Sequence, residues 1–588
     1  MRLRSRSVLR TRTRLDFRAV DATIAERRAA LLQAVPVWAP VTLGEFLRRK
    51  AEQYRDRPFI ITDERTLTYS DVEAWSTRLA DGLAEIGVRQ GDRVGIVMAN
   101  YLEFAPVKFA VAKVGAVAIP FNFLYQTDEL AYVLRQSRCN VLITMSSFAG
   151  LDQLSMLDEI APGWERGVTP GLPDLRRVVV FPTDDRRRDE AMTLDELDAL
   201  GAAHPGGADD SGVAPSDDCD ILYTSGTTDS PKGVVISHDA PVRTGYASAL
   251  TRAYQDGRRV LFSLPCYHMF GLVEGLIAVM HVGGAIIPRL TFSAADYLSA
   301  TERHRANDLL AVPTMAVALL EHPDRLTRDL SSLSAILCAA APAPTWVWER
   351  AAVELGITEV TTGYGMTECG GSMVLTLPED PLERHTRTVG RVKMAGAAAM
   401  TGTAGLCEYR TADVTTGELL PDGQEGELVS CGPTHMRAFW DKPAETAEAL
   451  RDGWLRSGDL GRIDDDGSLY LTGRAKELYK SGGELVMPKE IEDLVVQLPG
   501  VSQVFAIGIP DERWGEVGCL WIVPEPGSNV SADDALSLCR EKLARFKVPK
   551  HVVFSTAAEL PTTTTGKVQK FRMVPLAVSK LPVMKSGS

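Results

Sequence analysis

The 588-residue chain lacks several features that would each point to a class of protein. Its nine cysteines include no C-x-x-C pair, so the sequence offers no thiolate metal site and reduced, mostly buried thiols are expected. It has no uninterrupted membrane-length apolar run, because polar or charged residues interrupt the two most apolar windows, residues 104–121 and 272–290. It also has no excess of positive charge, since the formal net charge of -13 argues against nucleic acid as a partner.

The N-terminus is basic but has no apolar core, and it is therefore not a secretory signal. Seven arginines fall within the first 18 residues. A disordered start is the simpler interpretation, and a transit peptide is the alternative that composition leaves open. We expect a basic extension over residues 1–40, a cytoplasmic protein and no integral membrane segment.

From about residue 43 the sequence alternates amphipathic helices with short apolar strands, which is typical of layered α/β domains. After residue 389 the pattern changes to short strands separated by Asp-Gly turns at residues 422, 452 and 466, and after residue 474 to a compact α+β pattern. The expected elements of the first part are helices over 70–86, 101–114 and 127–136, the last with Thr127 as its N-cap, and strands over 93–98, 116–120 and 140–145.

These patterns predict an α/β fold with two domains. The large N-terminal domain, residues 41–474, should combine layered α/β sheets with a β-rich subdomain. The small C-terminal domain, residues 475–580, should be α+β and mobile.

A loop of glycine and hydroxyl residues, closed by Lys232, indicates phosphate binding. Residues 223–233 read Tyr-Thr-Ser-Gly-Thr-Thr-Asp-Ser-Pro-Lys-Gly. Glycines let backbone N–H groups approach phosphate oxygens, hydroxyls add donors and the lysine adds a mobile positive charge. It is not the Walker loop, whose lysine is followed by Ser or Thr; an ordinary turn between strands is the alternative. The candidate binding residues are Thr224, Ser225, Gly226, Thr227, Thr228 and Lys232.

Four more motifs follow in order, at residues 265–271, 363–368, 457–460 with 473–476, and 561–567. Together with the phosphate loop they resemble the adenylate-forming superfamily, which contains acyl-CoA synthetases, peptide-synthetase adenylation domains and beetle luciferases. The resemblance implies ATP or AMP, Mg²⁺ and coenzyme A as ligands and a small-molecule carboxylic acid as substrate.

Activating an acid with ATP requires a site that neutralises charge while two anions meet. The resemblance implies that Glu368 holds Mg²⁺ and that Thr367 donates to the α-phosphate. It further implies that Tyr364 offers a flat face to adenine, that Asp459 accepts from the ribose hydroxyls, and that Lys567 bridges the acid and the α-phosphate. Also implied are a gate at His268 in the acyl channel and nucleotide contacts at Ala341, Pro342, Gly363, Gly365, Met366 and Arg474.

The second half-reaction of this superfamily is attack by a thiol after the small domain rotates about a hinge. The resemblance places the hinge at Lys476 and the passage of the pantetheine arm at Ser481, Gly482 and Gly483. The Ser-Gly-Gly-Glu form resembles CoA ligases more than other branches, although an ordinary turn would explain the two glycines.

The substrate is expected to be a medium-to-bulky acid without an amine. Residues 265–271 hold no aspartate to pair with an α-amine, and the third motif holds no tryptophan to fill the pocket, so we expect a fatty, aryl or natural-product acid. The sequence does not identify the acid or the oligomeric state.

Asp229 departs from the superfamily pattern, which has glycine at this position of the phosphate loop. A carboxylate facing the β- and γ-phosphates would oppose ATP binding. This departure opens an alternative, a thioester-forming variant that accepts acyl-AMP from a partner enzyme. A luciferase-like oxygenase and a non-catalytic acyl-adenylate binder are further alternatives.

Overall fold

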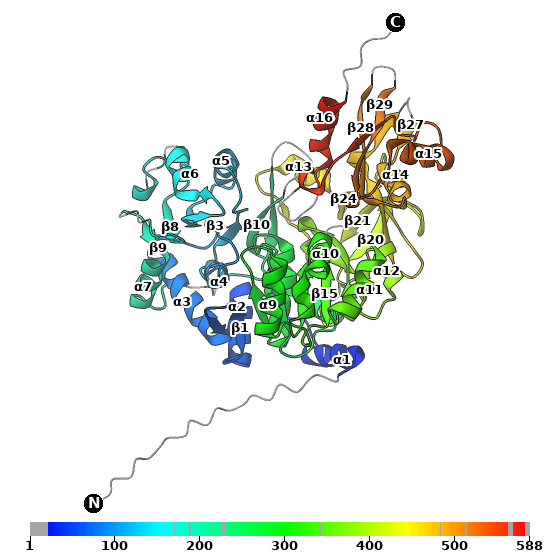
Figure 1. The fold of residues 1–588 in the computed structure, drawn as a ribbon. Coiled ribbons are helices and arrows are strands. Elements are labelled where there is room, and N and C mark those ends of the chain that lie inside the picture. The colour runs from blue at the N-terminus through cyan, green and yellow to red at the C-terminus, as the bar shows by residue number, and fades with distance from the viewer. Residues whose placement is uncertain are drawn as a thin grey trace, which may run out of the picture.

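A large domain formed around two sheets carries a smaller C-terminal domain at one end (Figure 1). The computed structural model describes residues 22–581, except for residues 168, 170, 187, 189, 209, 211, 225–230, 340–342, 482–483, 512–513 and 563–567. Within the described residues, no helix is both long enough and apolar enough to span a bilayer.

The first sheet is parallel from β9 to β10 and is extended by an antiparallel hairpin. Its order is β22-β11-β10-β4-β3-β5-β8-β9. The hairpin of β10 and β11 brackets the predicted phosphate loop. The strands are β3 (Arg93–Val97), β4 (Val117–Pro120), β5 (Val141–Met145), β8 (Arg177–Phe181), β9 (Met192–Thr193), β10 (Asp218–Thr224), β11 (Lys232–Ser237) and β22 (Ala438–Phe439).

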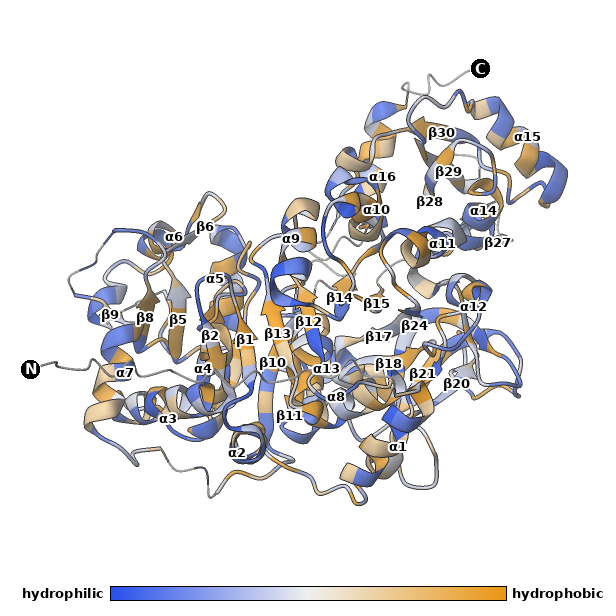
Figure 2. Cartoon of the chain, turned by 60° about the horizontal axis from the view of Figure 1, so that its bottom comes forward, coloured by the Kyte–Doolittle hydropathy of each residue, from blue (hydrophilic) through white to orange (hydrophobic). Residues whose placement is uncertain are grey.

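The second sheet has the order β16-β15-β14-β12-β13-β1-β2 and is parallel except for β2. Most of its strands are short and apolar and are buried over most of their length, and much of β12 and β13 has a hydrophobic colour (Figure 2). The strands are β1 (Pro58–Ile61), β2 (Thr66–Thr68), β12 (Arg259–Phe262), β13 (Ala285–Pro288), β14 (Asp308–Ala311), β15 (Ala335–Cys338) and β16 (Glu359–Thr361).

Helices pack against both sheets. All ten residues of α4 (Phe104–Lys113) are buried, and α8 (Asp239–Thr251) is nearly as covered, so both belong to the core of the domain. Other helices, such as α3, expose hydrophilic residues (Figure 2). The remaining helices of this region are α2 (Leu43–Tyr54), α3 (Tyr69–Glu85), α5 (Thr127–Gln136), α6 (Gln153–Ile160), α7 (Leu194–Ala203), α9 (Ala294–His304), α10 (Pro313–Glu321) and α11 (Thr345–Glu354).

Thr127 is not the N-cap of α5, contrary to the prediction. The helix begins at Thr127, and Gln126 is the capping residue with extended backbone angles of φ -81° and ψ 172°. The N–H of Gln126 donates to Glu129 in a capping box, so the acidic residue three positions on determines where this helix begins.

A β-rich subdomain follows, as predicted. The Asp-Gly pair at residues 452–453 makes a tight turn with φ of 52° and 83°, the paired positive values that a two-residue hairpin favours. The strands are β17 (Gly363–Met366), β18 (Gly371–Leu375), β19 (Arg391–Val392), β20 (Glu408–Ala412), β21 (Gly426–Cys431), β23 (Leu450–Arg451), β24 (Trp454–Ile463) and β25 (Leu469–Arg474), with α12 (Leu382–Arg387) and α13 (Pro443–Ala449) between them.

The small domain is α+β, which confirms the predicted fold class. Its sheet separates two apolar clusters, one around Ile491 and Leu520 and the other around Trp521 and Met573. Its elements are β26 (Tyr479–Ser481), β27 (Glu484–Val486), α14 (Pro488–Val495), β28 (Val501–Asp511), β29 (Gly515–Pro524), α15 (Ala532–Lys542), β30 (His551–Phe554) and α16 (Lys570–Lys580).

Helix α1 (Ile24–Ala34) lies within the region predicted as an extension and packs on the large domain. Leu31 is buried, and the Arg28 guanidinium donates to the Leu250 and Thr251 carbonyls at 3.3 and 2.8 Å. The Arg27 guanidinium pairs with Glu359 at 2.5 Å. Hydrogen bonds and an ion pair thus attach this helix to α8 and β16.

Replacing the buried His238 should weaken the acid sensitivity of the fold. Leu43 N donates to His238 Nδ1 at 3.3 Å, and burial lowers the pKa of His238 to about 4. Since the unfolded state binds this proton near pH 6.5, stability should fall as the pH falls from about 6.5 to 4, by roughly 2 kcal/mol between pH 7 and pH 5. His238→Asn should show a smaller decrease in urea midpoint over that range. The exposed His204→Asn is the control, and an equal decrease in wild type and H238N would contradict the prediction.

Candidate active site

The β17–β18 hairpin carries Tyr364 and leads into the turn with Thr367 and Glu368. Its glycines are required by close backbone contact. A Cβ built on Gly365 would lie 2.1 Å from the Gly371 carbonyl oxygen, and one built on Gly363 would lie 2.7 Å from the Val374 carbonyl oxygen. Only glycine therefore allows the hairpin to close in this way.

Tyr364, Asp459 and Arg474 form a hydrogen-bonded cluster. The Tyr364 hydroxyl donates to Asp459 Oδ2 at 2.6 Å, and Arg474 Nε lies 2.7 Å from Asp459 Oδ1. Asp459 and Arg474 face each other across β24 and β25, which explains their pairing. Burial, and then the charge of Asp459, raise the pKa of Tyr364 well above its usual value, so the phenol stays protonated and donates. Each carboxylate oxygen keeps a further lone pair for a ligand hydroxyl.

Glu368 lies in a short 3-10 turn, Thr367–Cys369, close to the same cluster. Burial raises the pKa of Glu368 and the charge of Asp459 adds to this, whereas Arg474 and Lys232 act in the opposite direction. The Met436 N–H donates to the Glu368 carbonyl at 2.7 Å and fixes the turn. The carboxylate is thus a partly desolvated anion between cationic neighbours.

Lys232 begins β11 directly opposite Thr224 at the end of β10. Its ammonium lies 5.0 Å from the centre of the Phe439 ring, a cation–π contact with β22. The predicted loop residues Ser225, Gly226, Thr227 and Thr228, and also Asp229, lie outside the described part of the chain. Lys232 is therefore the charged residue of this motif that the structure describes, and its positive charge favours the ionised form of Glu368.

His268 lies in the loop that follows β12. The Phe270 N–H donates to His268 Nδ1 at 3.2 Å, so Nδ1 acts as an acceptor and the ring proton is assigned to Nε2. The preceding Tyr267 packs edge-on against Phe123, with ring centres 5.3 Å apart. A π-helix, η2 (Phe270–Ile277), follows. Such helices are frequent at functional sites.

The predicted hinge region follows Arg474 directly. Residues Ala475–Glu477 form a 3-10 turn that contains the backbone of Lys476, whose side chain is not described. Ser481 is buried on β26, where Glu484 and Gly515 are its Cα partners. The other predicted residues, Ala341, Pro342, Gly482, Gly483 and Lys567, lie outside the described residues.

Lys570 is an ion-pair residue that the sequence did not reveal. Its ammonium lies 2.6 Å from Glu477 in the hinge turn and 2.7 Å from Glu492 on α14. The side chain of Lys570 is 15% exposed. Ninety-three positions separate Lys570 from Glu477, so no local pattern connects them.

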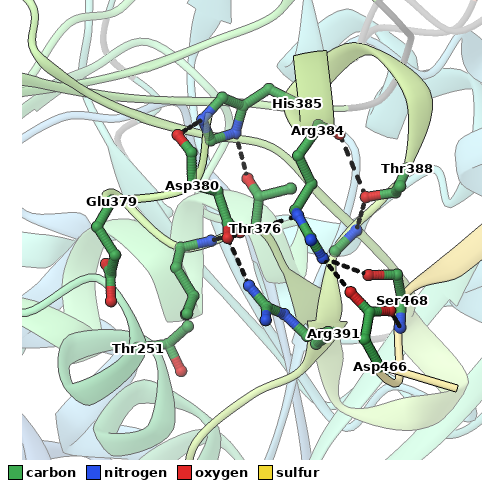
Figure 3. A network of polar contacts seen from close by, with 12 residues as sticks. Thr251, Thr376, Glu379, Asp380, Arg384, His385, Thr388, Arg391, Asp466 and Ser468 are labelled. Atoms are coloured by element: carbon green, nitrogen blue, oxygen red, sulfur yellow. Dashed lines mark hydrogen bonds and ion pairs between the residues drawn. The ribbon is translucent and has the colours of Figure 1, made fainter. Parts of the chain in front are cut away.

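A polar network supports the β17–β18 hairpin from the side of α12 (Figure 3). His385 donates from Nε2 to the Asp380 carbonyl at 3.1 Å, and its Nδ1 lies 2.7 Å from Thr376 Oγ1 at the end of β18. Arg384 donates to Asp466 and Ser468 at 2.6 and 2.7 Å, in the turn before β25. The network therefore links the hairpin that carries Tyr364 to the strand that ends at Arg474.

The described residues bring together Tyr364, Glu368, Asp459 and Arg474, with Lys232 close enough to act on Glu368. Cations, a hydroxyl donor and carboxylate acceptors at one place suit a phosphorylated ligand with ribose hydroxyls. Within the described chain, no three His, Cys, Asp or Glu side chains are grouped to hold a metal ion. A hard cation at this site would thus be coordinated by Glu368 together with oxygens of the bound ligand, an arrangement that Mg²⁺ favours.

The chain belongs to the AMP-binding enzyme family. The family model for AMP-binding enzymes matches residues 47–440, and the model for their C-terminal domain matches residues 490–567. These matches, with the relatives described next, confirm the predicted adenylate-forming superfamily and its acyl-CoA ligase branch.

Relatives of known name align over nearly the whole chain. A feruloyl-CoA synthase of an Amycolatopsis species is 34% identical over 532 residues, covering 90% of this chain and 97% of the relative. A 3-[(3aS,4S,7aS)-7a-methyl-1,5-dioxo-octahydro-1H-inden-4-yl]propanoyl:CoA ligase of Mycobacterium tuberculosis is 34% identical over 534 residues, with the same coverage. The structure of the anthranilate CoA ligase AuaEII with anthranoyl-AMP is 25% identical, has a TM-score of 0.78, and is matched over 92% of this chain and 98% of its own.

Asp459→Asn should weaken AMP binding. The substitution keeps the shape but removes the charge that pairs with Arg474, and it replaces one acceptor oxygen by a donor. We expect the Kd for AMP, measured by calorimetry, to rise about tenfold or more, since charge-assisted hydrogen bonds are stronger than neutral ones. Asp422→Asn, at a carboxylate whose side chain is 91% exposed, should keep the wild-type Kd. An unchanged Kd for D459N would contradict the role of this cluster.

Proposed function

We propose that this protein joins a medium-to-bulky carboxylic acid to coenzyme A in two steps. In the first, the acid and ATP give acyl-AMP and pyrophosphate. In the second, the thiol of CoA displaces AMP and gives the acyl-CoA thioester. The observation that carries the proposal is the convergence of Tyr364, Glu368, Asp459 and Arg474 beside the hinge to the small domain.

In the first step, a carboxylate oxygen of the acid forms a bond to the α-phosphorus while the bond to pyrophosphate breaks. Asp459 would accept from the ribose hydroxyls and Tyr364 would lie against adenine. Thr367 would donate to the α-phosphate. Lys232 and Lys567 would neutralise charge as the two anions approach. Glu368 would hold Mg²⁺, which when bound withdraws charge from the phosphate oxygens.

In the second step, the small domain would rotate at Lys476 and bring Ser481, Gly482 and Gly483 to the site. The CoA sulfur would form a bond to the acyl carbon while the bond to the AMP oxygen breaks, and the thiol proton would be released to solvent. Glycines beside the pantetheine arm would let it pass close to the backbone.

The acid is proposed to carry a bulky or ring-bearing group. The named relatives act on ferulate, on an indane-derived propanoate and on anthranilate. The absence of an aspartate in residues 265–271 favours an acid without an α-amine. We propose a cytoplasmic location, which the nine free cysteines support, because thiols stay reduced in that compartment.

A second candidate is a variant that forms the thioester from acyl-AMP made by a partner enzyme. Asp229 supports it, since a carboxylate in the phosphate loop would repel pyrophosphate oxygens and leave the AMP contacts intact. Adenylation needs the pyrophosphate contacts, whereas thioester formation does not.

One experiment separates the two candidates. The protein is incubated with a panel of fatty, aryl and polycyclic acids, ATP, Mg²⁺ and CoA, and in parallel with synthetic acyl-adenylates and CoA. Thioester from both reactions supports the full ligase. Thioester from the adenylates alone supports the second candidate, and no thioester from either would refute both.

Lys567→Ala should affect the two steps unequally. We expect adenylation, measured by pyrophosphate exchange, to fall at least a hundredfold, because the lysine stabilises charge in that transition state alone. Thioester formation from supplied acyl-AMP should remain within about threefold of wild type. Lys542→Ala, at a surface lysine of α15, should leave both rates unchanged. Equal losses in both steps for K567A would refute the assignment.

A further inference from the structure

Asn100 is a buried amide at a position that none of the sequence motifs includes. It follows β3 at the carboxyl end of the first sheet, and only 4% of it is exposed. Ligands of open α/β sheets bind at the carboxyl ends of the strands. A fully enclosed polar side chain at this edge must find partners, because an unpaired buried amide is costly.

Asn100 joins the two large sheets. Its Nδ2 donates to the Leu264 carbonyl at 3.0 Å and to the Arg289 carbonyl at 3.3 Å, and its Oδ1 accepts from the Cys266 N–H at 2.9 Å. Leu264 follows β12 and Arg289 follows β13, both in the second sheet. One side chain therefore connects the carboxyl ends of three strands, and one amide orientation satisfies all three bonds.

Two of these bonds hold the loop that carries His268. The bonds to Leu264 and Cys266 fix its start, and the His268 N–H donates to the Pro265 carbonyl at 3.1 Å. Gly271 packs closely onto the same loop, since a Cβ there would lie 2.4 Å from the Pro265 carbonyl oxygen. A shift at Leu264 would thus be transmitted to His268.

Side-chain packing alone does not fill the space beside this loop. A small cavity lies there, lined by Asn100, Tyr101, Phe104, Cys266 and Leu276 among others. The gap leaves its lining atoms with fewer packing contacts, so the hydrogen bonds of Asn100 contribute to holding the loop in place. The bonds of Asn100 therefore act together with core packing to fix the position of the loop.

We propose that Asn100 is a positioning residue for the acid site, acting through the Leu264–His268 loop. It places the His268 ring where the acid passes, and its effect should fall on the acid rather than on ATP. This inference rests on the proposed function, in which His268 lines the acyl channel.

Asn100→Asp is the informative variant, and Asn140→Asp is its matched control. The aspartate keeps the acceptor for Cys266 N–H but replaces Nδ2, which donates both other bonds, by one oxygen that faces the two carbonyls. Asn140 makes the same kinds of bond at the amino end of β5: its Oδ1 accepts from the Arg93 N–H at 2.9 Å and its Nδ2 donates to the Asp174 carbonyl at 3.3 Å. Asn140 is 7% exposed and lies at the amino end of the strands, whereas Asn100 lies at the carboxyl end of the same sheet.

We expect N100D to raise the KM for the acid about tenfold, as the loss of buried hydrogen bonds implies, with the KM for ATP within twofold. N140D should leave both KM values near wild type. The effect of N100D on the KM for the acid should largely disappear in a His268→Ala background, because Asn100 is proposed to act through the His268 side chain. Equal increases in both KM values, the same change in N140D, or full additivity with H268A would overturn the proposal.

A second measurement tests the positioning without any catalysis. Hydrogen exchange of the amides of residues 266–272 should speed up at least tenfold in N100D and stay at the wild-type rate in N140D. Wild-type protection of these amides in N100D would refute the proposal even if the protein proved to have another activity. If N100D does not accumulate as folded protein, Asn100→Ser, which keeps a small donor, takes its place with the same expected direction.

Discussion

The carboxylate of Asp459, held between the Tyr364 hydroxyl and the Arg474 guanidinium, is the interaction on which the candidate site depends. It links three strands, β17, β24 and β25. A carboxylate with a charge-assisted bond on one side and a phenol on the other has a fixed orientation. Its remaining lone pairs therefore point in defined directions, which is the condition for recognising a pair of ribose hydroxyls.

Burial and neighbouring charges act on the ionisation of Glu368 in opposite directions. Burial and Asp459 both disfavour its ionised form, and Arg474 and Lys232 favour it. A further cation would stabilise this partly desolvated carboxylate strongly, whereas it would stabilise a fully solvated carboxylate only weakly. The same two basic residues are available to phosphate oxygens, so the nucleotide and the metal ion would be bound by one balanced set of charges.

The sequence predicted the elements better than the contacts between them. Alternating patterns predicted β3 and α3 within one or two residues, because a local apolar period is visible in the sequence. The start of α5 was placed at the wrong capping residue, because Glu129 rather than Thr127 determines it. The motifs identified Tyr364, Asp459 and Arg474 by resemblance, but their mutual contacts depend on strand register, which no local pattern gives.

Residues that act through long-range hydrogen bonds were missed for the same reason. Lys570 reaches Glu477 across 93 positions, and Asn100 reaches Leu264 across 164. Neither has a neighbour in sequence that would mark it, since an isolated lysine or asparagine is most often a surface residue. Only the arrangement of sheets and domains brings their partners within reach.

The position of Arg474 would determine where the proposed hinge rotates. Arg474 is the last residue of β25, and the 3-10 turn of the hinge begins at the next residue. Its bond to Asp459 is worth about 2 kcal/mol as a charge-assisted hydrogen bond, and the network of Figure 3 holds the other end of β25 through Ser468. At the end of the hinge turn, Glu477 pairs with Lys570 of the small domain. The proposed rotation would therefore be confined to the backbone between Arg474 and Glu477, and the nucleotide site would stay intact while the small domain moves.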